Sequence, residues 1–118
     1  MSLKDKIINY TYTLPNSTLD RPFKKHPDYL VFRHRHNQKW YGMLMNVAYS
    51  QLNLPNEGAV DILNVKLSPE LVELLRNKPG YTAAYHMNKE HWLTILLDET
   101  CEKEHLFQLL EDSYYLTK

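Results

Sequence analysis

The chain has 118 residues, 43% of them hydrophobic, and its 14 basic and 14 acidic residues give a net charge of zero. This length is typical of one domain, so we expect residues 1–118 to form a single domain. The neutral balance argues against tight, non-specific nucleic-acid binding. A single cysteine excludes an intramolecular disulfide and a cysteine-based zinc cluster. The polar N-terminus and the lack of a long apolar run predict a soluble, cytoplasmic protein with no membrane partner.

The first half of the chain predicts one helix followed by three strands. Ser2 can cap a helix that stops before Pro15. Residues 29–35 and 40–47 have strand patterns, and the sequence HNQK between them suits a hairpin turn. Residues 61–67 alternate again and predict a third strand. The alternation of the second strand places these side chains on one side: Tyr41, Met43, Met45 and Val47.

The second half predicts a helix, two strands and a final helix. Ser68 caps and Pro69 occupies the first helical position, where the missing N–H costs no hydrogen bond. Strands are expected near residues 82–85 and 91–97, and a helix over about residues 102–116. The apolar stripe of this helix is Leu106, Leu109, Leu110 and Tyr114. The order α-β-β-β-α-β-β-α predicts an α+β domain with two layers, in which helices pack on a five-stranded antiparallel sheet.

Four segments of the chain carry a resemblance to a known family: VFRHRHNQKWYGMLM, LNVKLSPELVELLRN, YHMNKEHWLTILLD and LLEDSYYL. In this order and spacing they resemble the MmcQ/YjbR family of small bacterial proteins, over nearly the whole chain. The resemblance implies a CyaY-like or double-wing arrangement, which is usually described as DNA-binding by similarity of fold. It implies no catalytic or cofactor residues. Its motif positions have no assigned role here: Lys66, Pro69, His86, Lys89, Trp92 and Ser113.

Positive charge is concentrated between residues 21 and 39, where six basic side chains accompany one acidic side chain. This cluster is either a solvated face or an anion-binding edge. Arg33 and Arg35 are expected to point the same way along one strand. Together with the family resemblance, the cluster makes duplex DNA the leading partner hypothesis. The residues expected to contact DNA are Lys24, Lys25, Arg33, Arg35 and Lys39.

Apolar and aromatic side chains also fall on the second face of the predicted sheet. The strand phases that bury Met43 and Ile95 turn Trp40, Leu44 and Trp92 the other way. These three residues either pack into a second small core or form an exposed interaction face. The exposed alternative predicts a protein partner or a homodimer.

Candidate chemical groups are few. His34 and His36 are two apart, and a solvated strand end is expected there in preference to a metal site. Cys101 and His105 are four apart, but nearby acids disfavour a thiolate. No glycine-rich phosphate loop or pair of catalytic carboxylates is present. We therefore expect no enzymatic activity, cofactor or metal, and a small-molecule or metal site near His86 is a minor third hypothesis.

Overall fold

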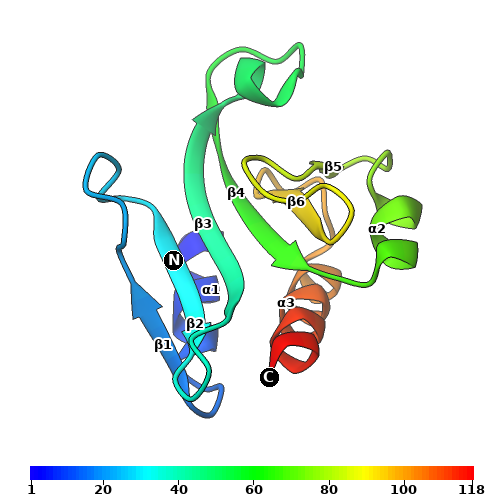
Figure 1. The fold of residues 1–118 in the computed structure, drawn as a ribbon. Helices are drawn as coiled ribbons and strands as arrows, with labels where there is room; N and C mark the ends of the chain where they lie inside the picture. Colours follow the sequence, from blue (N-terminus) through cyan, green and yellow to red (C-terminus); the bar gives the residue numbers. More distant parts are fainter.

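The computed structural model describes residues 1–118, which form an antiparallel sheet with helices against one of its faces (Figure 1). The six strands lie in the order β1-β2-β3-β4-β6-β5. None of the helices has the length and apolar character needed to cross a membrane. The elements in chain order are α1 (Leu3–Thr11), β1 (Ser17–Asp20), β2 (Leu30–His34), β3 (Trp40–Ala48), the 3-10 turn η1 (Tyr49–Leu52), β4 (Ala59–Lys66), α2 (Pro69–Leu75), β5 (Tyr81–Ala83), β6 (Trp92–Leu96) and α3 (Lys103–Thr117).

The mixed α+β class, the antiparallel sheet and the three helices agree with the sequence prediction, but the sheet has six strands and not five. The missed strand is β1, which pairs with β2 at the edge of the sheet. Its sequence STLD has one apolar residue and therefore lacks the alternation by which a strand is recognised, and in the structure all four residues are half-buried. The observed element order therefore differs from the expected one by an extra strand after α1 and by η1 before β4.

The helices cover one face of the sheet and enclose the larger of two hydrophobic clusters. This cluster contains 17 buried residues, including Ile7 of α1 and Val72 of α2. Helix α3 lies against β3 and β4, and its predicted apolar stripe is fully part of the cluster. Leu63 and Val65 of β4 and Ile95 of β6 also belong to it. The expectation that Met43 and Ile95 are buried on one face is wrong, because Met43 belongs to the smaller cluster.

A β-bulge in β3 changes which side chains face the helices. Phe32 is opposite Gly42, but Arg33 is opposite Trp40, so Tyr41 is an extra residue in the β2–β3 ladder. Tyr41 consequently packs in the helix-side cluster, whereas Trp40 packs on the opposite side. The predicted alternation, which grouped Tyr41 with the methionines of this strand, is wrong at this point.

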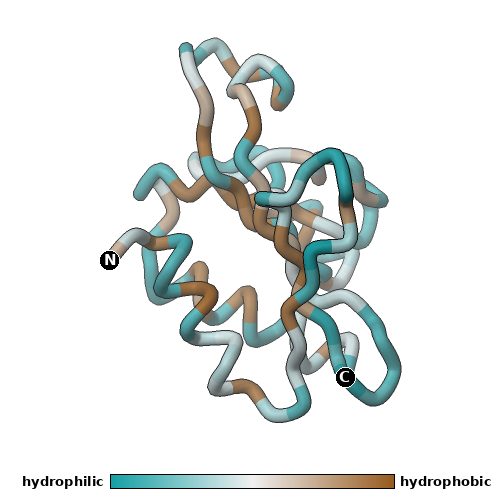
Figure 2. Tube along the Cα trace, turned by 90° about the vertical axis from the view of Figure 1, so that its left-hand side faces the viewer, coloured by the Kyte–Doolittle hydropathy of each residue, from teal (hydrophilic) through white to brown (hydrophobic).

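The opposite face of the sheet carries a second, smaller cluster of eight buried residues. It includes Met43, Met45 and Leu96 from the strands, and loops cover it in place of helices. In Figure 2 hydrophobic positions follow the strands and recur along the helices, and the surrounding loops are mainly hydrophilic. The predicted second face of Trp40, Leu44 and Trp92 is not this cluster, because Trp40 packs against it but Leu44 belongs to the helix-side cluster.

Candidate functional site

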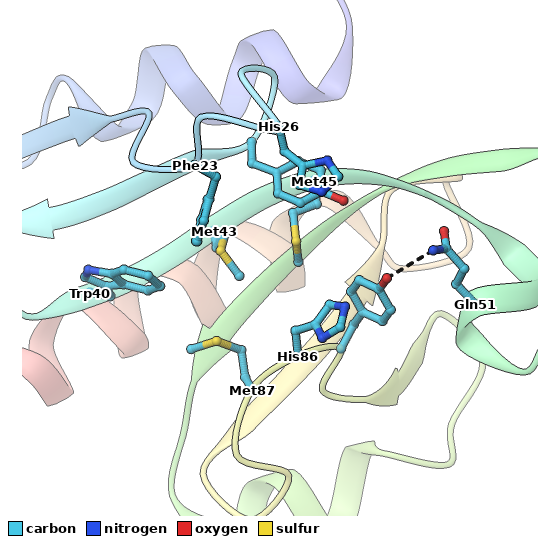
Figure 3. A pocket seen from close by; sticks show the side chains of 10 residues that line it. Phe23, His26, Trp40, Met43, Met45, Gln51, His86 and Met87 are labelled. Carbon is cyan, nitrogen blue, oxygen red and sulfur yellow. Dashed lines mark hydrogen bonds between the residues drawn. The ribbon is translucent and has the colours of Figure 1, made fainter.

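A cavity of about 550 Å³ opens on the loop-covered face of the sheet (Figure 3). Seven of its ten lining residues are hydrophobic. A mostly apolar pocket of this size, with a few polar groups, is typical of small-molecule sites. The lining residues are Phe23, His26, Tyr29, Trp40, Met43, Met45, Gln51, Tyr85, His86 and Met87.

Aromatic side chains from the loop between β1 and β2 form one wall of the pocket. Phe23 packs edge-on against both Trp40 and Tyr29, with ring centroids 6.1 Å apart in each pair. The His26 ring stacks on the Tyr29 ring, with centroids 4.4 Å apart and an angle of 7° between the ring planes. Edge-to-face and stacked contacts of this kind hold rings in defined positions. The wall is therefore an ordered aromatic surface, although it belongs to a loop.

Methionines form the floor and part of the opposite wall. Met43 and Met45 project from β3, and Met87 comes from the loop between β5 and β6 (Figure 3). The chain has four methionines, and the fourth is Met1, so every internal methionine lines this pocket. A thioether side chain is flexible and polarisable, and it adapts to ligands of irregular shape.

Two strand residues, Asn64 and Thr94, fix the position of the loop that carries Tyr85, His86 and Met87. Both are fully buried polar residues, and the Thr94 hydroxyl donates to Asn64 Oδ1 at 2.5 Å. Asn64 Nδ2 donates to the Tyr85 carbonyl at 3.0 Å, and the Tyr85 N–H donates to Thr94 Oγ1 at 2.9 Å. The backbone of Tyr85 is thus held by hydrogen bonds from the centre of the sheet.

The next residue, His86, has a left-handed backbone conformation with φ of 58°. Such a conformation is uncommon for a residue other than glycine, and it persists where the surroundings enforce it. Lys89 helps to hold the loop around His86, because its Nζ donates a hydrogen bond to the Ala84 carbonyl at 2.9 Å. His86 lies at the pocket wall, as Figure 3 shows, and its ring packs against Tyr85 with centroids 4.0 Å apart.

The polar corner of the pocket is formed by Gln51 and Tyr85. Gln51 Oε1 accepts from the Ala48 N–H at 2.9 Å, and Gln51 Nε2 donates to the Tyr85 hydroxyl oxygen at 3.2 Å. The backbone N–H of Ala48 thereby fixes the orientation of the amide. This corner was not found from the sequence, because Gln51 and Tyr85 are far apart in the chain and belong to no common motif.

The predicted DNA-contacting residues do not form one group. Arg33 makes an ion pair with Asp20, with Nε 2.8 Å from Oδ2, and its guanidinium lies 5.7 Å from the Trp40 ring centroid. Strand β2 ends at His34, so Arg35 lies in the hairpin turn and does not continue the strand face of Arg33. The predicted alignment of the two arginines is therefore wrong.

The remaining four cations lie at opposite ends of β2. Arg35 and Lys39 belong to the turn after it, and Lys24 and Lys25 belong to the loop before it. The five-residue strand β2, about 16 Å long at roughly 3.3 Å per residue, lies between the two pairs in the chain. All four side chains are exposed, and none makes an ion pair.

The predicted interaction face is also divided. Trp40 lines the pocket, but Leu44 is fully buried on the helix side of the sheet. Trp92 is 8% exposed. The bulge at Tyr41 explains the error, because it brings Trp40 and Leu44 to opposite faces although their even spacing predicts one face.

His34 is part of the helix-side core and not of a solvated strand end. It is fully buried, its Nε2 lies 2.8 Å from Thr117 Oγ1, and its ring packs against Tyr114 with centroids 4.7 Å apart. Burial lowers the pKa of His34 below its ordinary value. His36 is exposed. Nowhere in the structure do three or more His, Cys, Asp or Glu side chains gather as metal ligands do.

Several motif positions have structural roles. Ser113 Oγ accepts from the Lys66 N–H at 2.9 Å and donates to the Tyr41 carbonyl at 2.6 Å. The β3–β4 ladder begins only at the neighbouring pair, Gly42 and Val65, so the serine satisfies the backbone groups that the bulge leaves unpaired. Pro69 is the first residue of α2, behind a Ser68 cap that accepts from the Leu71 N–H at 3.3 Å.

Cys101 and His105 meet through Tyr81, whose hydroxyl oxygen is 3.1 Å from Cys101 Sγ and 2.6 Å from His105 Nδ1. Burial raises the pKa of the Cys101 thiol, which opposes formation of a thiolate nucleophile. The hydrogen bonds of the thiol and of the imidazole both go to the Tyr81 hydroxyl, so the two groups are connected only indirectly. The arrangement therefore resembles core packing more than a catalytic pair.

Comparison with known proteins places the chain in a family. The sequence model of the YjbR family matches residues 12–116. The chain is 39% identical to the uncharacterized protein YyaQ of Bacillus subtilis over the full length of both chains. It is 38% identical to the uncharacterized protein YjbR of Escherichia coli over 53 residues, which cover 44% of this chain and 45% of the other.

Solved structures agree with this assignment. A crystal structure of a Pseudomonas syringae protein has a TM-score of 0.92 at 42% identity, covering 98% of both chains. A crystal structure of the Deinococcus radiodurans protein DR2400 has a TM-score of 0.75 at 29% identity, covering 98% of this chain and 78% of the other. The resemblance seen in the sequence is thus confirmed at the level of the family, and the chain belongs to the YjbR family.

Proposed function

We propose that this protein is a non-enzymatic binding domain that holds a small apolar molecule in the pocket on the loop-covered face of its sheet. The observation that carries the proposal is the incomplete packing of this face, where aromatic and methionine side chains surround about 550 Å³ of space. If this face served stability alone, side chains would be expected to fill the space, because protein interiors are close-packed. The minor hypothesis of a small-molecule site near His86 becomes the leading one.

The arrangement of polar groups supports binding without chemistry. Gln51 and Tyr85 are hydrogen-bonded to each other, and His26 is stacked on Tyr29. Reaction at the pocket would need a nucleophile and a base in hydrogen-bond contact, together with a group that orients the base. The contacts of Gln51 and His26 hold polar side chains in fixed orientations, as in a site that binds a ligand without reacting with it.

A fluorescent apolar probe tests the proposal. N-phenyl-1-naphthylamine is neutral and becomes bright when it leaves water, and we expect it to bind the wild-type protein saturably at one site. Met87→Trp places a larger ring in the pocket from a loop position and should abolish binding. Leu74→Trp is the matched control, because Leu74 is 60% exposed on α2. Absence of saturable binding, or equal binding by Met87→Trp, would overturn the proposal.

DNA binding is kept as a second candidate because four exposed cations are not in ion pairs: Lys24, Lys25, Arg35 and Lys39. Their division into two pairs supports phosphate contacts at two separate points, with Arg33 excluded by its ion pair to Asp20. Anisotropy of labelled duplex DNA at two salt concentrations provides the test. Each phosphate contact should add about 0.9 to the slope of log affinity against log salt.

The two pairs of cations can be tested separately in the same assay. Reversing the charges of Arg35 and Lys39, or of Lys24 and Lys25, should each lower both the affinity and the salt slope. Lys4→Glu with Lys6→Glu on α1 is the charge-matched control. If neither loop variant differs from this control, or if the wild-type protein binds no DNA at low salt, the candidate is wrong.

A further inference from the structure

The Tyr85 hydroxyl has a proton with no acceptor in the protein. Its oxygen accepts from Gln51 Nε2 at 3.2 Å, and it makes no other hydrogen bond. Gln51 Oε1 already accepts from the Ala48 N–H. The polar corner of the pocket therefore offers two free donors, the Tyr85 O–H and the second N–H of Gln51 Nε2, and one of the two lone pairs of Gln51 Oε1 is already used. A ligand that fills the pocket satisfies this corner only if it presents an acceptor.

The charges around the pocket favour an acceptor with negative charge. None of the ten lining residues is acidic. Lys24 and Lys25 lie in the loop between the lining residues Phe23 and His26, and neither makes an ion pair. The acidic residue of the same loop is Asp28, and the loop between β5 and β6 carries Lys89 and Glu90, which balance each other. The loops that close the pocket thus have a positive excess.

We propose that the ligand of this pocket is a carboxylate on an apolar, ring-bearing body. The ring lies between the aromatic wall and the methionines of β3, and the carboxylate accepts from the Tyr85 hydroxyl and Gln51 Nε2. Hydrogen bonds to a charged acceptor are shorter and stronger than neutral ones. The loop lysines add long-range attraction that salt weakens. This inference rests on the proposed function and specifies the chemistry that the same pocket selects.

The Tyr85 side chain can recognise such a group because its backbone is fixed in advance. The Asn64 and Thr94 side chains hold both its carbonyl and its N–H, and Gln51 holds its hydroxyl. Little conformational freedom is left to lose when a ligand arrives, and a pre-positioned donor increases selectivity. The buried polar pair Asn64 and Thr94 then serves the pocket through Tyr85 as positioning residues.

Three compounds with one apolar body test the inference by calorimetry: 2-naphthylacetate, 2-(2-naphthyl)ethanol and 2-(2-naphthyl)ethylammonium. We expect the carboxylate to bind about tenfold or more tightly than the alcohol, and the ammonium to bind most weakly. Tyr85→Phe keeps the ring and the backbone contacts but removes the donor. It should weaken carboxylate binding about tenfold and change alcohol binding much less. Tyr115→Phe, at a position 58% exposed, is the control.

The outcomes separate this inference from the proposed function. If the alcohol binds as tightly as the carboxylate, or if Tyr85→Phe leaves carboxylate affinity unchanged, the pocket binds apolar molecules without selecting an anion, and only the inference is overturned. If none of the three compounds binds and N-phenyl-1-naphthylamine also fails to bind, both are overturned. Selective binding of the carboxylate that Tyr85→Phe removes would support both.

Discussion

The two faces of the sheet are built from the same strands but are completed in different ways. Helices close one face over a cluster of 17 buried residues, and the α3 residue Ser113 is hydrogen-bonded to the backbone of both β3 and β4. Loops close the other face over eight buried residues, and a cavity of about 550 Å³ remains. The contrast assigns stability mainly to the helix side and binding to the loop side, since sites are commonly carried by loops on a rigid scaffold.

The two faces can be compared directly by truncating neighbouring residues on opposite faces of β3 and measuring the loss of stability. Leu44 is fully buried under the helices, and Met45 is 3% exposed beside the pocket. We expect Leu44→Ala to lower the free energy of unfolding by about 3 to 5 kcal/mol, and Met45→Ala by about 2 kcal/mol, because Met45 already borders a cavity. Urea denaturation of the two variants measures this difference. Equal losses would contradict the assignment of stability to the helix side.

Ser113 offers a smaller test of how α3 is attached to the sheet. Ser113→Ala leaves the Lys66 N–H and the Tyr41 carbonyl without their partner. We expect a loss of about 2 kcal/mol in the free energy of unfolding, with no change in probe binding at the pocket. Ser50→Ala, at an exposed position in η1, should change stability by less than about 0.5 kcal/mol. A Ser113→Ala variant as stable as this control would show that the bridge contributes nothing.

His34 predicts a modest pH dependence of stability that originates on the helix side. Burial lowers its pKa in the folded state, so the unfolded chain takes up the proton more readily. Its contribution is complete above the unfolded pKa of about 6.5 and is lost as pH falls through the lower folded pKa. Wild type should therefore lose more stability between pH 7.5 and pH 5 than His34→Gln does. His36→Gln, at an exposed position, should keep the wild-type loss, and an identical pH profile for all three would refute this origin.

The helix side of the fold could be predicted from the sequence because its residues follow regular periods. The apolar stripe of α3 was identified correctly from spacing alone. The face of β3 was misassigned because a bulge at Tyr41 breaks the period of two, and no residue type marks such a bulge in advance. Strand β1 was missed because its sequence, STLD, has one apolar residue and no alternation.

The pocket could not be predicted in this way. Its walls come from three segments that meet only in the folded chain: the loop around Phe23 and His26, strand β3 with Gln51, and the loop from Tyr85 to Met87. One usable signal was present, since Asn64 and Thr94 are polar residues that each lie between two apolar neighbours in a strand. Buried polar side chains at such positions have specific partners, and here they hold the pocket loop.

The most direct test of the pocket is a 1H–15N correlation spectrum of the protein titrated with 2-naphthylacetate. We expect saturable shifts for the backbone amides of the pocket, in the loop from Phe23 to Tyr29, in β3 at Met43 and Met45, and from Tyr85 to Met87. We expect little change in the hairpin turn at Arg35 to Lys39 or along α3. Shifts confined to the turn or the helices, or a spectrum that does not change at all, would contradict binding at the pocket.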